Sequence, residues 1–127
     1  MSAWNGDELD RIGRAEELGI SSQRANGTDR PFVTIWAVRV GDHIYVRSAY
    51  GTGNPWYRRA LRSGIGRIHA GGVDRAVTLT PVGAAESRIQ EAVDAAYHAK
   101  YDRYGPRIVG SVVGKIAHQG TLRIDPR

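Results

Sequence analysis

The chain has 127 residues, which corresponds to one domain (residues 1–127) and is enough to bury an ordinary hydrophobic core. Hydrophobic residues make up 41% and charged residues 24%, a composition that excludes a disordered or low-complexity chain. Cysteine is absent, which excludes disulfides, thiolate metal sites and cysteine nucleophiles. The sequence shows neither an apolar run of membrane-spanning length nor a signal-peptide pattern at its start, so we expect a cytoplasmic protein with no membrane partner.

The net charge of +5 is concentrated in one part of the sequence. Between His43 and Val73 there are five arginines and no acidic residue, whereas the rest of the chain carries 13 basic and 13 acidic residues. This concentration of positive charge predicts a place where an anion can be held. The sequence contains no run of basic residues and no RNA-binding motif, so we expect no nucleic-acid partner.

The first half of the chain predicts a helix followed by strands. Residues 6–18 have a helical pattern, with Asn5 as N-cap and Glu8 completing a capping box. We expect strands in segments 20–25, 30–40 and 43–49. The second of these is apolar on both faces, as in a central or barrel strand, and forms a hairpin with the third.

The second half alternates helices and strands in the same way. A glycine-rich loop leads into a short helix that starts near Pro55, and a strand pair then turns at two consecutive glycines. The expected elements are a helix at 56–62, strands at 65–70 and 73–82, a helix at 84–104, an ambiguous segment at 108–120 and a strand at 121–124. Neighbouring strands that pair as hairpins predict an antiparallel α+β fold or a small barrel.

The segment 47–59 is the strongest candidate site. A strand end runs into a glycine-rich loop and then into a helix N-terminus, a geometry that favours phosphate, and we expect exposed guanidinium groups there. The alternative is a glycine-rich turn with solvated arginines. The candidate cofactor-binding residues of this segment are Arg47, Ser48, Gly51, Thr52, Gly53, Asn54, Trp56, Arg58 and Arg59.

Aromatic residues supply a second candidate feature. Tyr97, Tyr101 and Tyr104 lie on one face of the longest predicted helix, where they either pack against the sheet or point hydroxyl groups into a ligand cleft. Trp36 and Trp56 are either core residues or walls for a flat ring. The histidines lack metal-ligand spacing and the serines lack a hydrolase elbow, so we expect neither a metal site nor a catalytic triad, and no catalytic residue is assigned.

Three segments, Arg30–Trp36, Ile44–Ser48 and Asn54–Leu61, together resemble the flavin-binding split-barrel superfamily, and in particular its deazaflavin-dependent nitroreductase branch. The Pro-Trp-Tyr-Arg-Arg segment and the Tyr-His-Ala-Lys-Tyr-x-Arg-Tyr-Gly segment resemble a small uncharacterised bacterial family, over nearly the whole chain. The resemblance implies a small antiparallel split β-barrel with flanking helices.

The resemblance also implies a homodimer with FMN or the deazaflavin F420 near the dimer interface. Arg47, Ser48 and the loop to Asn54 would meet the cofactor phosphate, with the two arginines of the next helix beside it. Thr34 and Trp36 would lie along the ring, and the three tyrosines would close the substrate side. The resulting hypothesis is an oxidoreductase that acts on a small organic substrate. The alternatives are a non-catalytic module that binds a flavin or another flat anion, and a cofactor-free enzyme or partner-binding scaffold.

Overall fold

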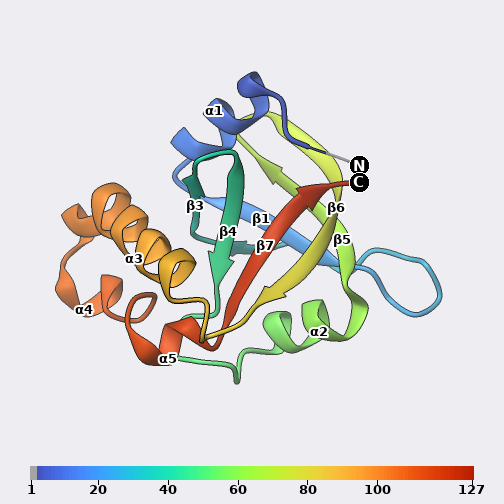
Figure 1. Ribbon diagram of the computed structural model, residues 1–127. Helices are drawn as coiled ribbons and strands as arrows, with labels where there is room; N and C mark the ends of the chain where they lie inside the picture. Colours follow the sequence, from blue (N-terminus) through green and yellow to red (C-terminus); the bar gives the residue numbers. More distant parts are fainter. Residues whose placement is uncertain (1–2) are drawn as a thin grey trace.

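The computed structural model describes residues 3–127 and has a seven-stranded antiparallel sheet at its centre (Figure 1). The strand order is β2-β1-β5-β6-β7-β4-β3. The strands are β1 (Leu18–Ser22), β2 (Val33–Ile35), β3 (Ala37–Val40), β4 (His43–Arg47), β5 (Ile65–Ala70), β6 (Val73–Val82) and β7 (Thr121–Pro126). All of the strand pairs are antiparallel, which confirms the predicted α+β class.

The sheet closes on itself at Trp36. The two edge strands, β2 and β3, are consecutive in the chain and are separated by this one residue. The chain therefore pairs with β1 before Trp36 and with β4 after it, so the sheet forms a nearly closed barrel that is split at this point. The single strand predicted at residues 30–40 is wrong in this respect. The expectation of burial on both faces holds at Ala37 and Val38, but not at Val33 and its neighbour in β2, which are exposed.

Helices surround the barrel, as predicted. They are α1 (Gly6–Arg14), α2 (Pro55–Ser63), α3 (Ser87–Tyr101), α4 (Pro106–Val109) and α5 (Lys115–His118), with a 3₁₀ turn at Asp102–Tyr104. Figure 1 shows α3 on one side of the barrel and α2 near its lower end. The segment before α1 lies against β7, where Trp4 donates to the backbone oxygen of Ile124 at 2.9 Å. None of the helices in the described part of the chain is long and apolar enough to cross a membrane.

Local sequence signals explain several element ends. Asn5 and Glu8 form the predicted capping box at the start of α1, but the helix ends four residues earlier than expected, because the chain turns extended at Ala15 and enters β1 at Leu18. The predicted strand at 20–25 is thus displaced toward the N-terminus. Gly66 lets β1 and β5 approach closely, since a Cβ atom there would lie 2.1 Å from the carbonyl oxygen of Ser21.

Two hydrophobic clusters fill the structure. The larger one fills the barrel and includes Leu18, Ile44, Ile68 and Leu122, which are all fully buried. The smaller one lies between the barrel and the helices α3 and α4, and is built around Tyr97 and other side chains of α3. The smaller cluster therefore fixes α3 and the segment after it against β3 and β4.

Candidate anion-binding site

Arg47 does not present its guanidinium at the surface. Its side chain is 0% exposed and lies beneath α3 and the segment that precedes β7. Five hydrogen bonds occupy its nitrogen atoms. Nη2 donates to the side chain of Gln90 at 2.6 Å, Nε donates to Thr121 Oγ1 at 3.0 Å, and the other acceptors are the backbone oxygens of Gln90 and Val112 and the carboxylate of Asp94. The expected exposure of Arg47 is wrong, because these acceptors enclose it.

Asp94 joins this buried arginine to a histidine. The carboxylate accepts from Arg47 and lies 2.9 Å from His118 Nε2. Burial by itself would raise the pKa of Asp94, but the hydrogen bonds from His118 and Arg47 outweigh burial and lower this pKa below its ordinary value. The Arg47–Asp94–His118 cluster therefore joins β4, α3 and α5 as a structural unit.

The glycine-rich loop after β4 uses its polar side chains internally. Asn54 Nδ2 donates to Ser48 Oγ at 2.9 Å and to the backbone oxygen of Ala49 at 2.7 Å, and the Ser48 hydroxyl donates to the backbone of Gly51. Asn54 makes no side-chain cap hydrogen bond to α2, although Pro55 lies at the start of that helix as predicted. Thr52 and Gly53 are exposed at the tip of the loop.

The tyrosines of α3 hold the split in the barrel. Tyr97 and Tyr101 are fully buried, and Trp36 stacks on Tyr101 with ring centroids 4.0 Å apart. Tyr97 donates to the backbone oxygen of Trp36, while the Tyr101 hydroxyl bonds to both backbone groups of Ala37. Burial raises the pKa of Tyr101 to about 12 and that of Tyr97 further, so both stay protonated. The prediction that Tyr104 shares this helix is wrong, because α3 ends at Tyr101; Tyr104 lies in the 3₁₀ turn that follows and is 44% exposed.

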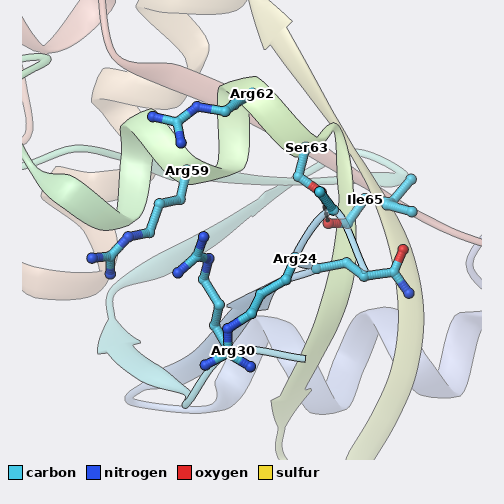
Figure 2. A pocket seen from close by; sticks show the side chains of 8 residues that line it. Arg24, Arg30, Arg59, Arg62, Ser63 and Ile65 are labelled. Carbon is cyan, nitrogen blue, oxygen red and sulfur yellow. Dashed lines mark hydrogen bonds between the residues drawn. The ribbon is translucent and has the colours of Figure 1, made fainter. Parts of the chain in front are cut away.

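Four arginines gather in a pocket on the other side of the fold, between the β1–β2 loop and α2. Figure 2 shows Arg59 and Arg62 on the helix and Arg24 and Arg30 on the loop, with the side chains of Arg59 and Arg30 reaching toward each other. The pocket has a volume of about 360 Å³. Within residues 3–127, none of these four guanidinium groups forms an ion pair with a carboxylate. We call this feature the arginine pocket.

Arg30 is the arginine of this pocket that the charges of its neighbours affect. Partial desolvation, and then the positive charges of Arg59, Arg24 and Arg62, lower the pKa of Arg30, although an arginine remains protonated at neutral pH. Arg24 is held in place by hydrogen bonds to the backbone oxygen of Asp29 and the hydroxyl of Thr28. The pocket thus presents planar, fully charged donors that match the oxygen atoms of a phosphate or carboxylate.

A smaller pocket of about 120 Å³ adjoins the arginine pocket and shares Arg30 and Arg59 with it. Its other walls include Pro31, Val33 and the half-buried Trp56. The two pockets together form a groove that is charged at one end and apolar at the other. Such a groove can hold a ligand that combines an anionic group with a flat ring.

The structure separates the residues that the sequence grouped as one site. Arg59 and Trp56 line the groove, whereas Arg58 is exposed outside it and Thr34 of β2 lines a different pocket together with Gly19 and His69. The groove also contains three arginines that the sequence reasoning did not select: Arg24, Arg30 and Arg62. The absence of acidic residues between positions 43 and 73 pointed to Arg62, but no local pattern pointed to the pair from the β1–β2 loop.

Comparison with solved structures identifies the class of fold. A conserved hypothetical protein of Mycobacterium tuberculosis matches with a TM-score of 0.57 at 10% identity, over 99% of this chain and 81% of its own. An FAD-binding protein of Mesorhizobium loti matches with a TM-score of 0.54 at 15% identity, and the match covers 98% of this chain and 91% of that protein. A pyridoxamine 5′-phosphate oxidase-related, FMN-binding protein of Nostoc punctiforme matches with a TM-score of 0.53 at 10% identity, and the match covers 100% of this chain and 81% of that protein. The chain is an α+β split barrel.

The family follows from the sequence itself. Residues 8–124 match the model of a family described as uncharacterised proteins conserved in bacteria, DUF2255, so the chain belongs to this family. This confirms the resemblance to a small uncharacterised bacterial family. No match to a curated protein sequence was found.

Proposed function

We propose that the protein binds a phosphorylated flavin-type cofactor, FMN or F420, and acts as an oxidoreductase on a small organic substrate. The observation that carries the proposal is the arginine pocket, which four arginine side chains line without an ion pair to a carboxylate in the described chain. An anionic ligand would relieve their mutual repulsion and would bind by charge-assisted hydrogen bonds. The split-barrel fold supports a flavin-type ligand in particular, because similar barrels hold FAD or FMN in other proteins.

The groove fits the two chemical parts of such a cofactor. Arg30 and Arg59 stand where its charged and apolar ends meet, so both can hold a phosphate while Trp56 and Val33 contact the ring system. Ser63 also lines the arginine pocket, although its hydroxyl already donates to the backbone oxygen of Ile65 at 3.0 Å. We assign the phosphate to the arginine pocket rather than to Arg47, whose donors are occupied.

The cofactor, when bound, supplies hydride-transfer chemistry, and the protein supplies binding, orientation and exclusion of water. The arginines fix the anionic end of the ligand, and Trp56 limits the tilt of a ring placed against it. Tyr104, in the 3₁₀ turn after α3, is the one tyrosine of the predicted set with an exposed ring, but it lies beside Trp36 and lines neither pocket of the groove, so we assign it no contact with a substrate held there.

The alternative function is a non-catalytic module that binds a flavin or another flat anion. It is favoured by the hydroxyl groups of Tyr97 and Tyr101, which bond to backbone atoms and so offer no proton to a substrate. Anaerobic reduction of the cofactor-loaded protein, followed by reoxidation with quinone and nitroaromatic acceptors, separates the two functions. An oxidoreductase reoxidises faster than the free cofactor, whereas a binding module does not.

We also propose a homodimer. The edge strand β2 exposes Val33, and the adjoining Phe32 is 42% exposed, so this side of the barrel offers apolar surface and unpaired backbone groups to a second copy. Light scattering at micromolar concentration should give twice the 13.9 kDa of one chain. A mass of one chain would contradict the dimer.

The binding proposal is tested by titrating the protein with FMN, FAD and F420 at the same low salt concentration. We expect Arg30→Ala and Arg59→Ala each to weaken binding by about 1.5–3 kcal/mol, roughly 10- to 150-fold in Kd, as for the loss of a charge-assisted contact. Arg88→Ala is the matched control, because Arg88 is an exposed arginine of α3 without an ion pair in the described chain.

The outcomes of this titration are distinct. Weaker binding by the two pocket variants, together with an unchanged control, supports the assignment. Equal affinities in all variants would remove the phosphate from the arginine pocket. A wild-type protein that binds none of the three cofactors would remove the basis for the flavin-type function and would favour a cofactor-free enzyme or scaffold.

A further inference from the structure

A second pocket, on the side of the barrel away from the arginine pocket, contains a lysine in an unusual setting. It has a volume of about 350 Å³ and lies between α1, β3 and α3. Small residues leave this space open, namely Gly13, Ala96 and Ala99. Lys100 lines it from α3 and is half-buried.

The amine of Lys100 is fixed by one hydrogen bond and has no ion-pair partner among residues 3–127. Its Nζ donates to the backbone oxygen of Ala37 at 2.7 Å and lies 5.1 Å from the centre of the Tyr101 ring. Burial lowers the pKa of Lys100 from an ordinary 10.5 to about 8. A neutral amine can keep its hydrogen bond to the Ala37 oxygen and still present a lone pair to the pocket.

The other charged groups of the pocket favour an anionic ligand. Asp10 of α1 is neutralised by Arg39 of β3, with 2.7 Å between carboxylate and guanidinium. Arg14, also on α1, has no ion pair within the described residues. Arg14 is therefore the cation left over beside the Lys100 amine, and Tyr101, whose pKa is raised, stays neutral.

The choice of lysine at this position is itself informative. The chain has 18 basic residues and only two of them, Lys100 and Lys115, are lysines. Arginine cannot lose its proton in a protein, whereas a buried lysine can. Almost all basic residues of this chain are arginines. The basic residue of α3 that lines this pocket is instead a lysine, whose amine can act as a nucleophile.

We propose that Lys100 is a covalent acceptor for small aldehydes or keto acids that carry a negative charge, held by Arg14 in the pocket between α1, β3 and α3. The neutral Nζ attacks the carbonyl carbon and forms a C–N bond, giving a carbinolamine. One amine hydrogen moves to the carbonyl oxygen when the carbinolamine forms; this hydroxyl then leaves as water with the second amine hydrogen, and a reversible imine remains. Nothing is oxidised or reduced, so the reaction needs no co-reactant. The proposal is independent of the flavin-type function.

The test uses pyridoxal 5′-phosphate and glyoxylate as anionic probes and propanal as a neutral probe, each trapped with borohydride. Modified lysines are located by mass spectrometry of tryptic peptides. Lys115, which is exposed, serves as the internal control in the same molecule. At pH 7.5 we expect Lys100 to be labelled at least about tenfold faster than Lys115, because a far larger fraction of its amine is neutral.

Variants separate the two parts of the proposal. Lys100→Arg should abolish the fast adduct, whereas Lys115→Arg should leave it unchanged. Arg14→Gln should slow labelling by the two anionic probes about tenfold without affecting propanal. Labelling of Lys100 no faster than that of Lys115, with folding confirmed by circular dichroism, would overturn the acceptor site. Equal effects of Arg14→Gln on anionic and neutral probes would overturn the role of Arg14.

Discussion

Replacing Arg47 by alanine should destabilise the fold strongly. The change removes the donors of five hydrogen bonds and leaves the oxygen atoms of Gln90, Asp94 and Thr121 without this partner. Removing one member of a buried ion pair typically costs about 3–5 kcal/mol. Because Asp94 is 25% exposed and keeps its contact with His118, we expect the lower part of this range, about 3 kcal/mol.

Urea denaturation followed by circular dichroism measures this loss, and thermal melting should show a decrease of roughly 10 °C or more for a chain of this size. Arg58→Ala is the control, since Arg58 is exposed on α2 and should change the free energy of unfolding by no more than about 0.5 kcal/mol. A loss below about 1 kcal/mol for Arg47→Ala would refute the reasoning, because it would mean that the cluster around this arginine contributes no net stability.

Three further predictions concern Tyr101, Asp94 and Arg30. Tyr101→Phe removes a buried hydroxyl that bonds backbone groups at the split in the barrel, and should lower the free energy of unfolding by about 1–3 kcal/mol in urea; an unchanged midpoint would contradict this. The pKa of Asp94 is lowered in the folded state, so its ionised form stabilises the fold at pH values above the ordinary pKa of 3.8, and this stability is lost as the pH falls through the lower pKa of the folded state. Asp94→Asn should therefore make the free energy of unfolding less dependent on pH in that acidic range. Parallel plots of this free energy against pH for the two proteins would contradict the prediction. Arg30→Gln should raise the melting temperature at low ionic strength by relieving repulsion, a gain that should disappear in about 0.5 M salt, and a gain that persists in salt would have another origin.

Local sequence patterns predicted the elements whose signals lie within a few residues. The capping box of Asn5 and Glu8 places the start of α1, and the turn at Gly71-Gly72 joins β5 and β6 with the predicted ends. Backbone geometry decides such features over a short stretch of chain. The division of residues 30–40 at Trp36 has no local signal of this kind, because it depends on Tyr101, which lies far along the chain.

The candidate site was less predictable, because both of its decisive features depend on distant residues. Arg47 looked like a surface arginine, but its acceptors begin 43 residues further on at Gln90 and are brought over it only by the fold. Arg24 and Arg62 line the same arginine pocket although nearly forty positions separate them in the sequence. Counting charges along the sequence finds arginines that are near one another in the sequence. Electrostatic repulsion depends on distance in space, so this count could not find the arginine pocket.

The position of β7 constrains the order in which the protein can assemble. This strand is the last of the seven in the chain, but it lies between β6 and β4; it pairs with β6 over residues 121–126 and with β4 over residues 121–124. Before residues 121–126 are available, the sheet can form only as two separate pieces, β2-β1-β5-β6 and β4-β3, each with an exposed inner edge. During synthesis, the barrel therefore stays open until the ribosome has released its last strand, and closure depends on contacts of long sequence separation that form slowly.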